Sequence, residues 1–211
     1  MTKIGLAMGL TLAAQAAGAN APLEITVQVF NNANAPVREV SQAKVEAAWI
    51  FQKAGIVVHW VDCTPEARAN VADLVCKQSD DPRLFVLTII NGNAPSRAED
   101  ALGFALLQGQ GNHAAALYPK VAALVANNPQ YANCALLGSV MAHELGHLLF
   151  RSTRHGEGVM NGHWSKNDFQ AMAQRKLRFT NDQAQTLRKM LAQRIEVSLS
   201  VTARMAAADL P

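Results

Sequence analysis

Two histidines and a glutamate stand close together in a segment of the chain that is otherwise apolar. His143 and His147 are four positions apart, and on a helix this spacing places both side chains on the same face. Two imidazoles on one face can bind a single Zn²⁺ through their ring nitrogens. Glu144 stands too far round the helix to join them as a ligand, but it can act as a general base toward water. These three residues therefore predict metal-assisted hydrolysis.

The helix that must carry this motif is predicted to cover residues 133–150, with Asn133 as its N-cap. Apart from its glycines it is apolar almost all round, which predicts a helix buried inside the domain. Its polar residues are Ser139, His143, Glu144 and His147. Burying unpaired polar groups is costly, so this stripe needs a partner, and a metal ion would be one. The competing interpretation is a pair of core histidines that hydrogen bonds satisfy.

A catalytic zinc ion usually has three protein ligands, so this helix leaves the site one ligand short. Residues after the helix that can fill the position are His155, Glu157, His163 and Asp168. The chain can turn after Phe150 and bring His155 back across the metal, while Gly156 and Gly158 allow a sharp change of direction. The residues alone leave the choice among the four candidates open.

The stretch HELGHLLFRSTRHGEGVM, residues 143–160, resembles the metzincin group of zinc metallopeptidases. In that group an HExxHxxGxxH run supplies three zinc histidines and is followed by a turn that contains a methionine. The continuations GVMNGHWSKNDF and LRFTNDQAQTLR are similar to those of a set of small exported bacterial proteins of this type. The resemblance is specific from Leu137 to about Leu187.

This resemblance implies a role for each residue of the motif. The implied zinc ligands are His143, His147 and His155, with Glu144 as the general base and Met160 in the turn beneath the metal. Asp168 as a ligand would indicate a different zincin group and would leave Met160 unexplained, so the resemblance favours His155. Two departures concern the connection: Phe150 stands at the glycine position, and His155 follows His147 by eight positions rather than six. Added loop length costs little, so the departures concern the shape of the turn more than the ligand.

The resemblance also implies that peptides bind along an edge strand of the sheet by backbone pairing. The candidate for that strand is GNHAAALY, residues 111–118. His113 can stand near the cleft or in an exposed turn, and Tyr118 or His163 can stabilise an oxyanion; nothing in the sequence decides these roles. His59, on a predicted strand, is most simply structural.

Hydrophobic periodicity outlines one α+β domain around the active helix. Strands are predicted over residues 23–32, 56–63, 83–92, 101–109 and 113–119, and helices over 41–55, 120–128, 133–150, 165–177 and 180–195. Ser41 is expected to cap the first helix, and Thr180 with Gln183 forms a capping-box signature for the last one. The nearly continuous apolar run at 83–92 predicts a strand buried on both faces.

The resemblance adds an architecture to these elements. It implies a zincin/metzincin-like fold with a twisted mixed sheet, an edge strand over the cleft, an active-site helix that carries HExxH, and a helical C-terminal part. No linker, repeat or low-complexity segment divides the chain after its first residues. We therefore expect a single zinc metallopeptidase-like domain over residues 20–211.

Residues 1–19 have the pattern of a secretory signal peptide, in which Lys3 precedes a short apolar run that ends in small residues. The alternatives are a buried N-terminal helix or a membrane anchor, but the run is too short and too rich in glycine to span a bilayer comfortably. We therefore expect a secreted or periplasmic protein without stable membrane insertion after cleavage. A formal net charge of +3 is too small to indicate nucleic-acid binding.

Export would make disulfide formation favourable. Cys63 and Cys76 flank a polar-rich segment between two apolar runs, which predicts a bridge between them. Such a bridge would be worth roughly 3 kcal/mol by loop entropy. Separate thiols are the alternative. Cys134 opens the apolar helix and is expected to pack as a small hydrophobic residue.

These features predict an exported zinc-dependent endopeptidase that acts as a monomer on peptide or protein substrates. An alternative from another class is a zinc-stabilised module that binds peptides or proteins without cleaving them. Glu144 argues against this alternative, because a structural zinc site has no use for a general base. A third interpretation is a globular domain in which HExxH is coincidental. Substrate specificity depends on the shape of a pocket, of which the sequence indicates only that residues after Met160 contribute.

Overall fold

The computed structural model describes residues 22–63, 76, 80–92, 100–107, 112–128 and 133–208 of the 211-residue chain. The segment 1–19, interpreted above as a signal peptide, lies outside the described residues. The strands are β1 (Leu23–Asn31), β2 (Ile56–Asp62), β3 (Leu84–Ile90), β4 (Gly103–Leu106) and β5 (His113–Leu117). The helices are α1 (Val37–Lys53), α4 (Tyr118–Ala126), α5 (Asn133–Phe150), α6 (Lys166–Ala173) and α7 (Asn181–Ala208), with a short 3₁₀ helix η1 (Gly158–Met160).

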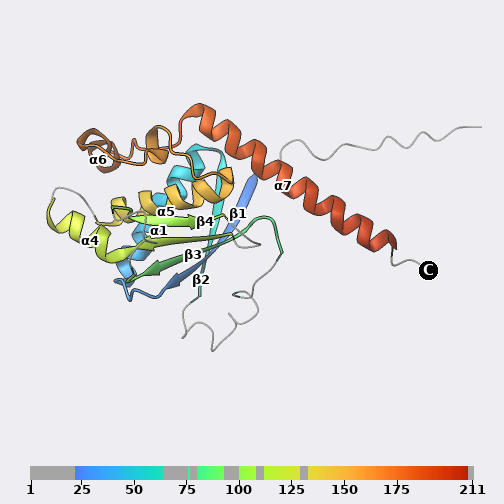
Figure 1. Ribbon diagram of the computed structural model, residues 1–211, viewed down its shortest axis with the longest axis horizontal. Coiled ribbons are helices and arrows are strands. Elements are labelled where there is room, and N and C mark those ends of the chain that lie inside the picture. The colour runs from blue at the N-terminus through green and yellow to red at the C-terminus, as the bar shows by residue number, and fades with distance from the viewer. Residues whose placement is uncertain are drawn as a thin grey trace, which may run out of the picture.

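The described strands form one mixed sheet in the order β2-β1-β3-β5-β4 (Figure 1). Strands β2, β1, β3 and β5 run parallel to their neighbours, whereas β4 pairs antiparallel with β5. The predicted α+β fold with a mixed sheet is therefore confirmed. The expectation that residues 111–118 form the edge strand is wrong, because β5 lies between β3 and β4 and β4 is the edge. Two short neighbouring strands have similar sequence patterns, so periodicity does not reveal which one is outermost.

One face of the sheet packs against α1 and α5, which lie side by side (Figure 1). The side chains that meet these helices alternate along each strand, as in a sheet covered on one face. In β1 they are Ile25, Val27 and Val29, and in β3 they are Phe85, Leu87 and Ile89. The other residues of β3 are partly exposed, so the expectation that this strand is buried on both faces is wrong.

A glycine lets α5 approach α1 closely. A Cβ atom at Gly138 would lie 2.7 Å from the Ala43 carbonyl oxygen and 2.7 Å from Glu46 Cβ, both on α1. Contacts this short leave no room for any side chain, so the two helices are in direct backbone contact at this point. This contact holds α5 directly against α1 in the core.

The first helix begins earlier than the sequence predicts. It starts at Val37 directly after Pro36, and Ser41 lies inside it rather than at its N-cap. Proline is favoured around the first turn of a helix because its missing N–H would be unpaired there anyway. The predicted end is confirmed, since Gly55 follows the helix with a φ of 79°. Pro36 begins the helix because its carbonyl oxygen accepts from the Val40 N–H, so the helix is already under way before Ser41 could act as a cap.

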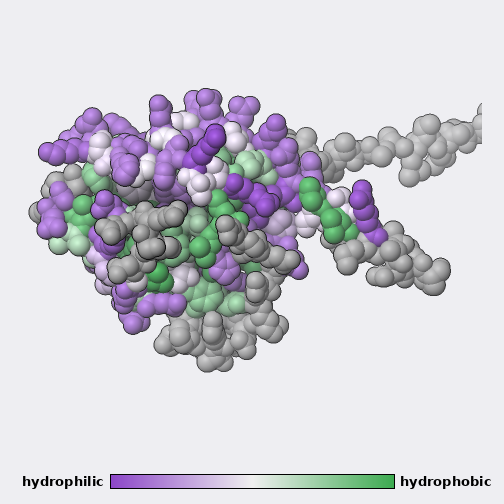
Figure 2. All heavy atoms as spheres, in the orientation of Figure 1, coloured by the Kyte–Doolittle hydropathy of each residue, from purple (hydrophilic) through white to green (hydrophobic). Residues whose placement is uncertain are grey.

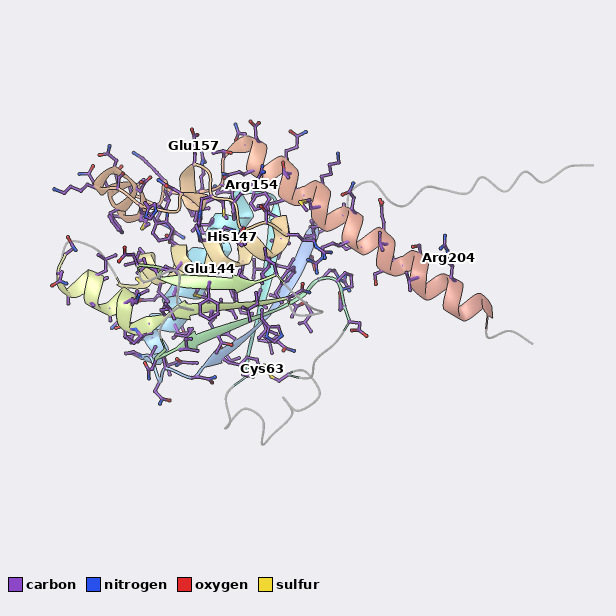
Figure 3. The ribbon with its side chains drawn as sticks, in the orientation of Figure 1. Cys63, Glu144, His147, Arg154, Glu157 and Arg204 are labelled. Carbon is purple, nitrogen blue, oxygen red and sulfur yellow. A yellow bond between two sulfur atoms is a disulfide. The ribbon has the colours of Figure 1, made fainter. Side chains whose placement is uncertain are left out.

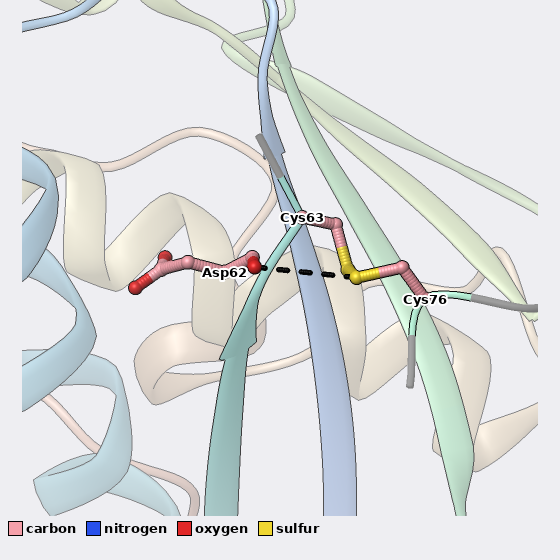
Figure 4. Close-up of a disulfide and its surroundings, with 3 residues drawn as sticks. All are labelled: Asp62, Cys63 and Cys76. Carbon is pink, nitrogen blue, oxygen red and sulfur yellow. Dashed lines mark hydrogen bonds between the residues drawn. A yellow bond between two sulfur atoms is a disulfide. The ribbon is translucent and has the colours of Figure 1, made fainter. Parts of the chain in front are cut away.

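A disulfide joins Cys63, at the end of β2, to Cys76, as predicted (Figure 4). The Cα atoms are 5.8 Å apart, within the usual range for such a bridge. Cys63 is 1% exposed and its backbone N–H donates to the Val29 carbonyl oxygen of β1. The bridge therefore ties residue 76 to the core at the end of two adjacent strands. Cys134 is a free cysteine, partly buried in the first turn of α5.

The C-terminal helices follow the active helix, as predicted. Thr180 and Gln183 form the predicted capping box at the start of α7, with backbone N–H groups donating to Gln183 Oε1 at 2.9 Å and to Thr180 Oγ1 at 3.3 Å. The first half of α7 packs on the domain, and the second half projects beyond it (Figure 1). Apolar atoms are visible on that projecting part (Figure 2), where Val197, Leu199 and Val201 are exposed. Among the described residues, no helix has the length and apolar character needed to cross a membrane.

Candidate metal centre

Helix α5 buries the polar stripe that its sequence places among apolar residues. Exposed fractions are 1% for Ser139, 7% for His143, 5% for Glu144 and 5% for His147. The helix is covered by α1, by β4 and β5, and by α4, α6, α7 and η1, which explains why it is apolar almost all round. The predicted buried helix with one polar stripe is therefore present, and the stripe faces the segment that follows the helix.

Three imidazoles converge at this stripe. Ligand atoms of His143, His147 and His155 all lie within 4.8 Å of one another. The rings of His143 and His155 are stacked at 5.3 Å between centroids, and the His147 ring stands edge-on to both. Figure 3 shows Glu144 and His147 near the centre of the domain, with Arg154 and Glu157 on the segment above them. The structure therefore brings together the three histidines that the resemblance implies as ligands.

Hydrogen bonds decide which ring nitrogens of the helical histidines are free. Nδ1 of His143 lies 2.7 Å from the Val159 carbonyl oxygen, and Nδ1 of His147 lies 2.7 Å from the Ser152 carbonyl oxygen. A carbonyl oxygen only accepts, so both Nδ1 atoms carry the proton and donate it. The two Nε2 atoms face each other at 3.0 Å. In neutral rings they are two acceptors without a proton between them, so this contact is not a hydrogen bond.

A metal ion bound by both Nε2 atoms would account for this arrangement. Two Nε2 lone pairs at 3.0 Å fit ligands that each lie about 2.0–2.1 Å from one Zn²⁺. A metal-bound histidine usually donates its other ring N–H to a carbonyl or carboxylate oxygen, which fixes the orientation of the ring. The donor set and its hydrogen bonds therefore fit a metal centre better than a pair of core histidines.

Burial shifts the pKa values of the groups in the centre. It lowers the pKa of His143 to about 4, helped by the neighbouring His147 and His155 and opposed by the hydrogen bond to Val159. Burial likewise lowers the pKa of His147 and of His155. The imidazoles are therefore neutral at physiological pH, which is the form that binds metal. Burial also raises the pKa of Glu144 to about 8, because the charged carboxylate loses its hydration.

The turn after α5 is made without the expected glycine. The helix ends at Phe150, and Arg151 adopts the left-handed conformation with a φ of 49°. The N–H of Arg151 donates to the Leu148 carbonyl oxygen and that of Ser152 donates to the His147 carbonyl oxygen. This pair of bonds is a Schellman motif, in which a glycine usually occupies the position that Arg151 has here. The chain thus turns one residue later than in the HExxHxxGxxH pattern.

The segment η1 closes the centre from beneath. Val159 accepts the His143 Nδ1–H, and its own N–H donates to the Arg178 carbonyl oxygen at 3.0 Å. Met160 is 2% exposed and packs under α5, where a Cβ atom at Gly146 would lie 2.7 Å from its Sδ. Gly158 has a φ of 62°, and a side chain there would collide with the Arg178 carbonyl oxygen. This segment therefore positions His143 through its backbone.

The other candidate ligands are engaged elsewhere. Asp168 Oδ2 accepts from the Ser165 backbone N–H at 2.8 Å and forms the capping box of α6. Glu157 and His163 are exposed, and neither belongs to the histidine cluster found among the described residues. Of the four candidates for a third ligand, only His155 is thus part of that cluster.

The structure also places the remaining residues singled out in the sequence. The Tyr118 hydroxyl donates to Glu39 Oε2 of α1 at 2.8 Å, and the oxyanion role named for Tyr118 stays a prediction. His113 begins β5, an inner strand, and is partly buried. His59 pairs with Glu24 at 3.1 Å on the exposed surface of β2 and β1, in keeping with a structural role.

Three contacts with the centre were missed by the sequence analysis. Trp164 stands edge-on to His143 with 5.7 Å between ring centroids, and its Nε1 is buried without a hydrogen-bond partner in the described residues. Gly103 of β4 lies against Glu144, and Gly162 lies against the His155 ring. These contacts join segments that are far apart in the chain or on two sides of a loop, so local hydrophobic periodicity does not predict them. Only Gly162 has a sequence signal, because it stands between Met160 and the candidate His163.

Comparisons with known proteins agree with this site. A model of peptidase family M13 matches residues 115–210, a region that includes α5, η1 and the C-terminal helices but is less than half of the chain. Among curated proteins, no sequence matches the chain. The match to the family model is therefore the sequence finding that bears on the activity.

Three solved structures are similar to the chain. A zinc-dependent peptidase from Methanocorpusculum labreanum has a TM-score of 0.52 and 15% identity, over 76% of this chain and 99% of that one. Archaemetzincin from Methanopyrus kandleri has a TM-score of 0.48 and 19% identity, over 81% of this chain and 96% of that one. Metalloproteinase-II from Bacteroides fragilis has a TM-score of 0.47 and 12% identity, over 82% of this chain and 55% of that one. The first of these shows that the fold is shared.

The fold, the HExxH helix and the family match together identify the chain as a zincin-like zinc metallopeptidase, an enzyme that hydrolyses peptide bonds. This class is the one that the resemblance predicts.

Proposed function

We propose that the chain is an exported zinc endopeptidase in which His143, His147 and His155 hold the metal and Glu144 is the general base. The observation that carries this proposal is the pair of facing Nε2 atoms, 3.0 Å apart, whose rings donate their other nitrogen to backbone carbonyls. Zinc is proposed because three neutral imidazoles with an open fourth position are a common catalytic site for this ion. Met160, packed beneath α5, is proposed as the turn methionine.

The chemistry follows from the neighbours of the metal position. Zinc, when bound, would polarise the peptide carbonyl and make water nucleophilic near neutral pH. Glu144 adjoins His143 on α5, and its carboxylate would take a proton from the attacking water and pass it to the leaving amine. Burial raises the pKa of the Glu144 carboxyl, and the positive charge of a bound metal ion would lower it again, toward the ionised form that accepts a proton.

We propose that a peptide substrate lies extended along β4. This strand is the sheet edge next to Glu144, because Gly103 at its start is in contact with that side chain. A peptide backbone can pair with the outward N–H and C=O groups of an edge strand, as in other cases of strand addition. Such pairing recognises the backbone and not the sequence of the substrate, which suits an endopeptidase.

Export is supported by two independent observations. Residues 1–19 have the composition of a signal peptide, and the Cys63–Cys76 bridge is typical of proteins that fold in an oxidising compartment. We propose a secreted or periplasmic domain over residues 20–211. The monomeric state stays a prediction.

The test compares Glu144→Ala with the wild-type protein on casein, an unstructured substrate. We expect the variant to keep about one zinc per chain by elemental analysis and to lose cleavage. Glu157→Ala is the matched control, because Glu157 is an exposed glutamate close to the same centre, and it should cleave normally. Cleavage by Glu144→Ala at the wild-type rate would overturn the assignment of the base. A zinc-loaded wild-type protein that binds peptides and leaves them intact would support the binding module instead.

A further inference from the structure

Two glycines outside α5 lie directly against side chains of the metal centre. A Cβ atom at Gly103, in the edge strand β4, would lie 2.7 Å from Glu144 Cγ and 2.8 Å from Glu144 Oε1. A Cβ atom at Gly162, two residues after Met160, would lie 2.7 Å from Cγ and 2.8 Å from Nδ1 of His155. Neither distance is compatible with a side chain, so each glycine leaves the space that the functional group occupies.

We propose that Gly103 and Gly162 are positioning residues, Gly103 for the Glu144 carboxylate and Gly162 for the His155 imidazole. The inference rests on the proposed function, because it takes Glu144 as the base and His155 as a ligand. It adds that the position of the Glu144 carboxylate is determined by the strand that receives the substrate. The position of the His155 ring is determined by the segment after Met160.

The Gly103 contact joins the general base to the edge strand. Gly103 pairs with Ala116 of β5, and α5 is fixed in the core, so neither backbone can move freely. Glu144 is 5% exposed, so its carboxylate has little space into which it can withdraw. An added methyl group would therefore shift the carboxylate relative to β4, and a displacement of about 1 Å at a catalytic group can cost on the order of 100-fold in rate.

The Gly162 contact supports a ligand that has few other supports. His155 is exposed, unlike the two helical histidines. Its ring is bounded by His143, stacked at 5.3 Å, by His147, edge-on at 5.0 Å, and by Gly162. A methyl group at position 162 would push the ring away from the place where the three ligand atoms meet. The effect should resemble loss of a group that orients a metal ligand, which typically costs about 10–100-fold in metal affinity.

The test for Gly162 measures zinc affinity by competition with a chelator in a double-mutant cycle. We expect Gly162→Ala to weaken zinc binding by about 10–100-fold. In a His155→Ala background the same substitution should change zinc affinity little, because the ring that it displaces is absent. An equal loss in both backgrounds, or no loss in the first, would overturn the positioning role.

The test for Gly103 uses a peptide hydroxamate. This group chelates zinc, and its N–H and O–H can donate hydrogen bonds to a carboxylate. Gly103→Ala should weaken hydroxamate binding and lower kcat on the order of 100-fold, with KM and zinc content near the wild-type values. In a Glu144→Ala background, where the colliding atoms are gone, it should not weaken hydroxamate binding further. A Cβ atom at Gly103 would also lie 2.6 Å from the Ala115 carbonyl oxygen of β5. If the substitution acts only by disturbing that strand, the losses will be equal in both backgrounds and the proposal fails.

Controls separate the possible failures. Gly92→Ala, whose added methyl would meet, among the described residues, only the flexible end of Ile90, should leave zinc affinity, hydroxamate binding and kcat unchanged. Should Gly103→Ala fail to fold, recovery of folding in Gly103→Ala/Glu144→Ala supports the steric link, and failure of that double variant overturns it. A wild-type protein that binds zinc and hydroxamate but cleaves no peptide would refute the proposed function, while both binding cycles would still test the two glycines.

Discussion

The two helical histidines and the third histidine of the centre are held in different ways. His143 and His147 stand on one buried helix, and each donates its Nδ1–H to a backbone carbonyl oxygen. His155 lies exposed on the segment after the helix, where Gly162 bounds its ring. Two of the proposed ligands are thus placed by secondary structure and core packing, and the third is placed by the path of a loop. The proposed loop ligand, His155, is therefore the part of the centre that can vary with least damage to the fold.

The largest effect is expected from His147→Ala, which removes one of the two proposed ligands on α5. Loss of a group that only orients a metal ligand can cost roughly 100-fold in metal affinity. Loss of the ligand itself should lower zinc affinity by far more. The metal-free protein should also lose stability, because a buried side chain is replaced by a cavity. Chelator competition and thermal melts of the metal-free forms measure the two effects. Near-normal zinc affinity in this variant would contradict the proposal that His147 on α5 binds the metal.

His155→Ala tests the proposed ligand that lies on the loop after α5. Zinc binding should weaken strongly, yet the stability of the metal-free protein should change by no more than about 0.5 kcal/mol, as for most exposed positions. The same two measurements apply. His163→Ala is the control, since His163 is an exposed histidine nearby and should retain zinc. A greater loss of zinc in His163→Ala than in His155→Ala would show that the wrong histidine has been assigned.

Gly158→Ala tests whether the segment beneath the metal supports the helical ligands. Gly158 has a φ of 62° and no space for a side chain, so the substitution should displace Val159, which accepts the His143 hydrogen bond. We expect the melting temperature to fall and zinc affinity to decrease by about 10–100-fold. Calorimetry and chelator competition measure these changes. Unchanged zinc affinity in a destabilised protein would mean that His143 needs no support from this segment.

The smallest effect is expected from Arg151→Gly. Arg151 has a φ of 49°, a conformation that costs a non-glycine residue about 1–2 kcal/mol. After the greater unfolded-state freedom of glycine is allowed for, we expect a gain of about 1 kcal/mol and a melting temperature roughly 2–4 °C higher. Zinc affinity should stay the same, because the turn keeps its shape. A lower melting temperature would show that the Arg151 side chain makes contacts that offset its strained backbone.

Local signals explain most of what the sequence predicted correctly. Helix α5 has its predicted bounds because a continuous apolar segment surrounds a single polar stripe. The capping box of Thr180 and Gln183 and the Cys63–Cys76 bridge also depend on residue types at short spacing. Such features are set by chemistry within a few residues and can be read from the chain directly.

What the sequence did not reveal depends on contacts between distant segments. The order of β4 and β5 in the sheet is decided by the pairing of β5 with β3. The partial exposure of one face of β3 depends on which elements cover the sheet. Asp168 is a possible ligand by type, and only its bond to Ser165 shows that it caps a helix. The shape of the turn at Arg151 could not be predicted, because a non-glycine residue can adopt a positive φ at a modest cost in free energy that the surroundings offset.

The two edges of the sheet differ in charge. On β2, His59 pairs with Glu24 and Asp62 pairs with Lys44, so this edge is flanked by ionisable groups. Strand β4 has the sequence GFAL, without a charged residue, and its Leu106 is 50% exposed. Charged groups are a common protection against strand-to-strand aggregation, so β4 is the less protected edge. The edge proposed to receive a peptide is then also the one at which concentrated protein would begin to associate, and a bound peptide would keep it in solution.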